Sequence, residues 1–163
     1  MKIAVGSDHR GVKQKEFVKK VLGDLGHTPV DLGSYGEDSV DYPDIAWKVG
    51  KSVADGESDS GILICDTGIG MSIAANKVDG IRAALCCDAF AAERSRLHND
   101  ANVLCLSGRQ EEGVMRQIIS SFMSTSLPLS LIFTLPELKR ILSIKVTFNL
   151  PSSSSILTSC DSI

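Results

Sequence analysis

Along most of the chain, short apolar runs alternate with segments whose apolar residues recur at helical spacing, and this alternation constrains the fold most strongly. The runs are continuous and partly β-branched, which is typical of parallel strands that are covered on both faces. The predicted strands are 2–5, 28–32, 62–64, 81–85 and 102–106, and the predicted helices are 11–25, a helix opened by Pro43, 71–76, 89–98 and 111–123. The sequence therefore predicts an α/β fold, a Rossmann-like three-layer αβα sandwich with a five-stranded parallel sheet.

Composition narrows the class of protein. At 163 residues the chain has the length of one domain with a substantial core. Its net charge of −3 includes no basic excess, so we expect no nucleic acid partner. The chain does not open with a signal-peptide pattern, and its longest late apolar stretch, 127–135, is well short of the ~20 residues that a membrane span needs. We therefore expect no membrane partner.

The five cysteines form no CxxC and no Cys/His spacing that would indicate a metal site. An odd number of cysteines without a secretion signal favours reduced thiols and a cytoplasmic protein. Cys86, Cys87 and Cys105 lie in or next to apolar runs, where we expect them to be small core residues.

The segment most informative about function begins at Cys65, where an apolar run stops and a glycine-containing turn leads into a possible helix. Ligands bind beyond the carboxyl ends of strands in open α/β sheets, and free amides at a helix start favour negative charge. Cys65 could be a nucleophile or base there, although one more buried cysteine is the alternative. Thr67 offers a hydroxyl, and Gly68 and Gly70 let the backbone approach a ligand. Asp66 would disfavour a thiolate unless it points to solvent.

Two familiar anion-binding loops do not fit this segment. A dinucleotide-binding GxGxxG aligned on Gly68 and Gly70 would need a third glycine where Ile73 stands. A cysteine phosphatase loop would need an arginine where Met71 stands. The segment therefore indicates an enzyme that acts on a small anionic molecule by other chemistry.

Further candidates lie at the ends of predicted strands and helices. Asp8 and His9 follow the first strand and should share the sheet edge of Cys65, with a helix cap and a surface histidine as the alternative. Arg109 follows a strand and could bind a phosphate with two hydrogen bonds, or be solvated. His98 and Asn99 lie between a helix and the last strand, where a surface histidine is the alternative.

Together these motifs resemble the ribose-5-phosphate isomerase B family, which also includes galactose-6-phosphate and allose-6-phosphate isomerases. The resemblance runs from Met1 to about Thr125 and depends on several uncommon motifs in one order. They are Gly6–His9, Val40–Asp44, Gly61–Cys65, Thr67–Gly70, Ser72–Lys77, Gly80–Ala83, Ser95–Leu104 and Gly108–Arg109.

The resemblance implies that the protein interconverts ribose 5-phosphate and ribulose 5-phosphate in the pentose phosphate pathway, without metal or other cofactor. Galactose 6-phosphate or allose 6-phosphate is the nearest alternative substrate, and an impaired phosphosugar-binding homologue is a further alternative. Cys65 matches the base that moves a proton between C2 and C1. The backbone of Asp66, Thr67, Gly68, Ile69 and Gly70 matches the part that stabilises the enediolate, and the Thr67 position supports this exchange.

The remaining site residues are also assigned by resemblance. His98 matches a histidine that helps to open the furanose ring. Asp8 and Asn99 match residues that hold sugar oxygens, whereas His9 and Arg109 match phosphate contacts. Family members form homodimers or larger assemblies, such as tetramers, with active sites shared between subunits.

The resemblance ends where the composition changes. Family members continue after the last helix with a segment whose arginines complete the phosphate site, and neither arginine is recoverable after Ser124 and Thr125. All 14 glycines occur by Gly113, and the chain then becomes rich in serine and leucine. We therefore divide the chain into a Rossmann-like isomerase domain, 1–125, and an atypical tail, 126–163. We hypothesise that a disrupted reading frame encodes this tail.

Overall fold

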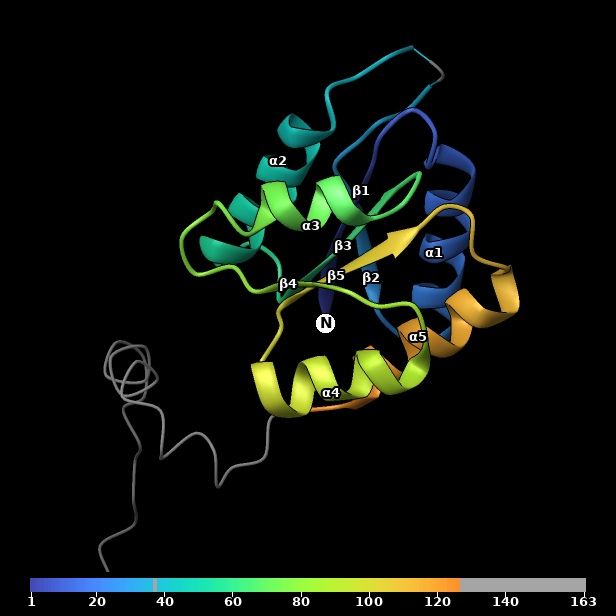
Figure 1. Ribbon diagram of the computed structural model, residues 1–163, viewed down its shortest axis with the longest axis vertical. Helices are drawn as coiled ribbons and strands as arrows, with labels where there is room; N and C mark the ends of the chain where they lie inside the picture. The colour runs from blue at the N-terminus through green and yellow to red at the C-terminus, as the bar shows by residue number, and fades with distance from the viewer. Residues whose placement is uncertain (37, 127–163) are drawn as a thin grey trace, which may run out of the picture. The chain divides into compact units, whose positions relative to one another are not determined.

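The computed structural model describes residues 1–36 and 38–126, which form a five-stranded parallel sheet with helices on both faces (Figure 1). The strand order is β2-β1-β3-β5-β4. In chain order the elements are β1 (Lys2–Ser7), α1 (Val12–Asp24), β2 (Thr28–Asp31), α2 (Tyr42–Ala54), β3 (Ser60–Cys65), α3 (Ile69–Ala75), β4 (Ala83–Leu85), α4 (Ala89–Asn99), β5 (Val103–Ser107) and α5 (Glu112–Ser124). The predicted fold class is confirmed.

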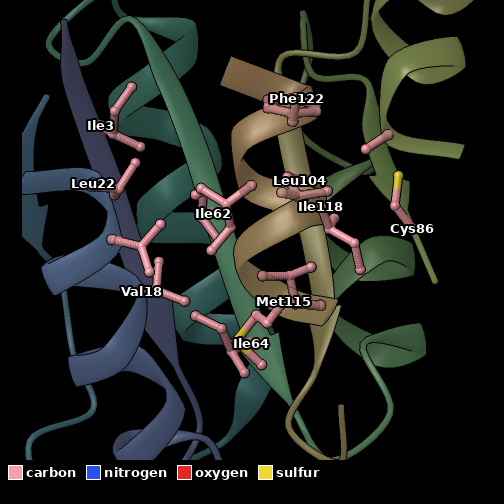
Figure 2. Packing of buried hydrophobic residues seen from close by; sticks show 14 of the residues in the cluster. Ile3, Val18, Leu22, Ile62, Ile64, Cys86, Leu104, Met115, Ile118 and Phe122 are labelled. Carbon is pink, nitrogen blue, oxygen red and sulfur yellow. The ribbon is translucent and has the colours of Figure 1, made fainter. Parts of the chain in front are cut away.

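The core consists of two apolar clusters, one on each face of the sheet. On one face, Ile62 and Leu104 from the central strands pack with Val18 of α1 and with Met115 and Ile118 of α5 (Figure 2). On the other face, alternate strand residues pack against α2 and α3; this cluster includes Ala4, Leu63, Val103, Ile45, Val49 and Met71. Because both faces are covered, the central strands β1, β3 and β5 are buried at successive positions, as the sequence indicates.

The order of the strands fixes where a ligand can bind. From β1 the chain crosses to β2 on one side, and β3 then pairs with the opposite side of β1. The direction of winding therefore reverses between β1 and β3. In open α/β sheets such a switch point leaves a crevice beyond the carboxyl ends of the two strands. These ends lead directly to Asp8 and to Asp66.

Some sequence expectations need correction. Cys87 is exposed rather than part of the core, because it lies beyond the end of β4, whereas Cys86 and Cys105 are buried as expected. The helix expected at 11–25 begins only at Val12 and ends at Asp24, and its C-cap Leu25 is 39% exposed. The strand expected at 81–85 begins only at Ala83.

Of the tail expected at 126–163, all but Ser126 lies outside the described residues. Within residues 1–36 and 38–126, no helix has the length and apolar character that crossing a membrane requires.

Candidate active site

Cys65 is the last residue of β3 and lies under the loop that leads into α3. It is 6% exposed, and its Sγ accepts a hydrogen bond from the N–H of Gly68 at 3.1 Å. Gly68 has φ +79°, and a Cβ there would lie 2.5 Å from Leu85 Cδ1. Only glycine adopts this conformation readily and fits this space. The loop therefore holds a backbone amide against the sulfur.

The first turn of α3 supplies further amides near Cys65. The Ser72 N–H makes the first intrahelical bond, to Gly68 O, so the amides of Gly70 and Met71 precede the helical ladder. Thr67 Oγ1 accepts a hydrogen bond from the Ile69 N–H at 3.3 Å, and both side chains are exposed. This short stretch therefore combines a thiol, a hydroxyl and backbone N–H groups, which can stabilise an oxyanion.

Asp8 lies beside this loop, at the same sheet edge. Its N–H donates to Ile64 O at 3.2 Å, and its Oδ1 accepts from the N–H groups of Arg10 and Gly11, each at 3.0 Å. The carboxylate thus holds the turn that precedes α1, whereas the N-cap of this helix is Gly11 and has no side-chain cap, so the helix-cap alternative is wrong. Among the described residues Oδ2 has no hydrogen-bond partner, so one oxygen can still accept from a ligand hydroxyl.

His9 follows at the start of the same turn and is half-buried. Its Nδ1 is buried and has no hydrogen-bond partner within the part of the chain that the structure describes. A buried polar atom without a partner costs free energy, and a bound ligand can supply the missing bond. His9 is therefore a reasonable ligand contact at the switch point.

Arg109 lies on the loop between β5 and α5, next to the Cys65 loop. The two loops are joined, because the Gly108 N–H donates to Cys65 O at 2.7 Å and Ser107 Oγ donates to Asp66 O at 2.8 Å. Arg109 donates from Nε and Nη2 to the two carboxylate oxygens of Asp66, at 2.8 and 2.9 Å. The hydrogen bonds from Arg109, together with its charge and that of Arg10, hold the pKa of Asp66 below its usual range. Asp66 therefore directs its charge toward a guanidinium group.

Tyr42, the first residue of α2, is a neighbour of the site that the residue-by-residue sequence reasoning did not single out. A Cβ at Gly70 would lie 2.8 Å from its ring, and the residue is 43% exposed. Its sequence signals are its place in the Val40–Asp44 motif and its position just before the helix-opening Pro43. Tyr42 thus forms a wall beside the Cys65 loop.

His98 and Asn99 are not brought to Cys65 within one chain. They end α4, which leads into the start of β5, and the Arg82 guanidinium donates to Asn99 O at 3.1 Å. The register pairs Val103 with Gly61 and Ser107 with Cys65, so the amino end of β5 is about 13 Å from Cys65 along the sheet. His98 is exposed at that distant edge, with Nε2 3.3 Å from Arg94 Nη1. The structure therefore leaves these two residues apart from the Cys65 loop.

The side chains near Cys65 supply hydrogen bonds and positive charge. Within the described ranges, no group of three His, Cys, Asp or Glu side chains is arranged to hold a metal ion. The groups that do gather near Cys65 are hydrogen-bond donors, one carboxylate oxygen of Asp8 and the two arginines around Asp66. These groups suit a small anionic substrate that carries hydroxyl groups. They also suit a reaction in which a base removes a proton from a carbon next to a carbonyl.

Comparison with known proteins gives a consistent result. A family model described as Ribose/Galactose Isomerase matches residues 3–130. The chain is 47% identical over 127 residues to a putative sugar phosphate isomerase of Bacillus subtilis, covering 77% of this chain and 85% of that protein. It is also 47% identical over 108 residues to ribose-5-phosphate isomerase B of Escherichia coli, covering 66% of this chain and 72% of the relative.

Solved structures show the same similarity. The type B ribose 5-phosphate isomerase of Trypanosoma brucei superposes with a TM-score of 0.78 at 44% sequence identity. The superposition covers 86% of this chain and 97% of that one.

Proposed function

Because this chain belongs to the ribose/galactose isomerase family and is a sugar-phosphate isomerase, we propose that it interconverts ribose 5-phosphate and ribulose 5-phosphate with Cys65 as the base. The observation that carries the proposal is the hydrogen bond between the Gly68 N–H and Cys65 Sγ at the carboxyl edge of the sheet. It supports the proposal because it holds a thiol and a loop amide together beyond the carboxyl end of β3, and ligands of open α/β sheets bind beyond such strand ends.

The proposed reaction is a proton transfer within the open-chain sugar. Cys65, as thiolate, removes the proton from C2 of the aldose, and the electron pair of the C–H bond forms the C1–C2 double bond as O1 becomes negative. The amides of the Cys65 loop stabilise this enediolate, because they are fixed before charge develops. The thiol then returns the proton to C1 as the O2 proton moves to O1, and the C2 ketone results. Protons and electrons balance without an added reactant.

Substrate contacts are proposed from the geometry and the family. The free oxygen of Asp8 accepts a sugar hydroxyl, and His9 and Arg109 contact the phosphate. Phosphate binding away from C2 holds the sugar in a reactive position. A catalytic cysteine that must not be oxidised suits a reducing compartment such as the cytoplasm. The proposed reaction suits the pentose phosphate pathway.

We also propose that the active site is completed by a second copy of the chain, as a homodimer or larger assembly. His98 and Asn99 lie on the far edge of the sheet, so a partner has to supply them. Beside the Cys65 loop, Ile69 and Ile73 are 53% and 59% exposed, one helical turn apart on α3. An apolar pair of this kind suits a subunit contact. The partner's α4 would then reach the loop.

Mixing two inactive variants tests the shared site. Cys65→Ala and His98→Asn are unfolded together and refolded, so that mixed dimers form. A mixed dimer of a two-fold assembly contains one intact site, so about a quarter of native activity should return. No recovery from mixtures shown to contain mixed dimers would contradict the shared site.

A panel of sugar phosphates tests the substrate. Ribose 5-phosphate should have the highest kcat/KM, with allose 6-phosphate and galactose 6-phosphate lower. The family description names galactose beside ribose, so a six-carbon sugar phosphate is the second candidate. A higher kcat/KM for either six-carbon compound would overturn the five-carbon assignment.

A further inference from the structure

Asp66 places a carboxylate directly after the proposed base, at the rim of the site. Its two oxygens accept hydrogen bonds from Nε and Nη2 of Arg109, and Arg10 Nη1 lies 3.9 Å from Oδ2. Two arginines, Arg109 and Arg10, thus lie around the carboxylate of Asp66. The same guanidinium edge is the one that binds a carboxylate or a phosphate with two parallel hydrogen bonds.

The geometry of the Asp66–Arg109 pair allows Arg109 to exchange the carboxylate for a phosphate. Hydrogen bonds from the Gly108 N–H and from Ser107 Oγ join the two loops, so the backbone of Arg109 is held in a defined position. Its side chain, however, is 74% exposed, and that of Asp66 is 33% exposed. Exposed ion pairs are weak, because water and salt compete with them. A phosphate can therefore displace the carboxylate at a small cost.

We propose that Asp66 competes with the substrate's phosphate for Arg109 and so weakens the binding of phosphate compounds to this site. The inference depends on the proposed function, which assigns Arg109 to the phosphate. Without ligand, the carboxylate occupies the guanidinium edge. When a phosphate binds, the Asp66–Arg109 bonds break and phosphate–Arg109 bonds form, with no covalent change. Asp66 stays negative near neutral pH, because Arg109 holds its pKa below its usual range.

A positioning role for Asp66 would have the opposite effect. If Asp66 mainly oriented Arg109 for the phosphate, its removal would weaken phosphate binding. Two features favour competition. The carboxylate uses both donors of one guanidinium edge, and its charge neutralises a cation that would otherwise attract a dianion.

Calorimetric titration of the full chain with inorganic phosphate at low ionic strength tests the proposal without using catalysis. Asp66→Asn removes the charge and should lower the Kd for phosphate by about two- to five-fold, the range expected for an exposed ion pair. Asp66→Gly, which removes the whole side chain, should act in the same direction. High salt should reduce the difference.

Two controls separate competition from a general charge effect. Asp55 forms an exposed pair with Lys51 at the end of α2, where the chain returns to the other edge of the sheet, so Asp55→Asn makes the same change in net charge. It should leave the Kd unchanged. In an Arg109→Met background, Asp66→Asn should no longer tighten phosphate binding.

Each result decides the proposal. Tighter binding that requires Arg109 supports competition. Unchanged or weaker binding in both folded Asp66 variants overturns it, as does equal tightening in Asp55→Asn or in the Arg109→Met background. If the titrations show tighter phosphate binding that requires Arg109 but the chain isomerises no sugar phosphate, the proposed function fails and the competition stands. If it isomerises ribose 5-phosphate but the Kd does not fall, only the competition fails.

Discussion

Gly68→Ala should damage both stability and catalysis, because this glycine meets two separate constraints. Its φ of +79° is a left-handed conformation, which costs a residue with a Cβ about 1–2 kcal/mol. The added Cβ would also lie 2.5 Å from Leu85 Cδ1 and 3.0 Å from the backbone of Leu106. Relieving such an overlap costs a further ~1–3 kcal/mol.

Gly56→Ala is the matched control for this substitution. Gly56 has φ +74°, but a Cβ there would meet nothing within 4 Å. Both variants share the backbone strain and the reduced entropy of the unfolded chain. The difference between them in free energy of unfolding should therefore be the overlap, about 1–3 kcal/mol. Denaturant unfolding followed by circular dichroism measures this difference.

The catalytic effect separates the two glycines further. Moving the Gly68 loop to relieve the overlap displaces the N–H that contacts Cys65 Sγ at 3.1 Å. A displacement of about 1 Å can reduce kcat by about 10²-fold, whereas Gly56→Ala should retain native kcat. Equal unfolding free energies for the two variants, together with native kcat in Gly68→Ala, would refute this reasoning.

Three further predictions concern other parts of the chain. Burial raises the pKa of Asp31, but hydrogen bonds from Lys15 and Lys19 lower it more. The contribution of Asp31 to the free energy of unfolding should therefore be lost as pH falls below about 4. Asp31→Asn should flatten this loss when unfolding is measured from pH 6 to 3. Lys15→Met should lower the free energy of unfolding by about 3 kcal/mol, because the buried ammonium donates to Asp31 and to Ser34 O, each at 2.6 Å. An unchanged unfolding midpoint would contradict this. Replacing 126–163 with the arginine-bearing ending of the family should lower KM for ribose 5-phosphate by at least about ten-fold, since a charged hydrogen bond contributes about 1.5–3 kcal/mol, and equal KM values would refute a phosphate role for those arginines.

The fold was predictable because it depends on local patterns. Apolar runs and helical spacing mark each strand and helix that the structure describes, and the parallel sheet then requires Asp8 and Cys65 to share an edge. The errors arose at ends of elements. The sequence predicts Cys87 in the core because it lies next to an apolar run, yet β4 ends at Leu85 and leaves Cys87 exposed.

The site was only partly predictable, because its contacts join residues that are distant in sequence. The Asp66–Arg109 pair spans 43 positions and joins a half-buried carboxylate to an exposed guanidinium, which no apolar periodicity marks. The contact between Tyr42 and Gly70 depends on how α2 crosses the sheet. The distant position of His98 follows from the alternation itself, since a helix that leads into a parallel strand ends at the amino edge.

Hydrogen exchange at the carbon atoms of ribose 5-phosphate most directly tests the role of Cys65. The sugar phosphate is incubated in heavy water with the native chain or with Cys65→Ala, and deuterium at C2 of the aldose and C1 of the ketose is followed by NMR. The native chain should introduce deuterium at both carbons during turnover, and folded Cys65→Ala should introduce none above the rate without enzyme. Exchange by Cys65→Ala at the native rate would show that another group moves the proton.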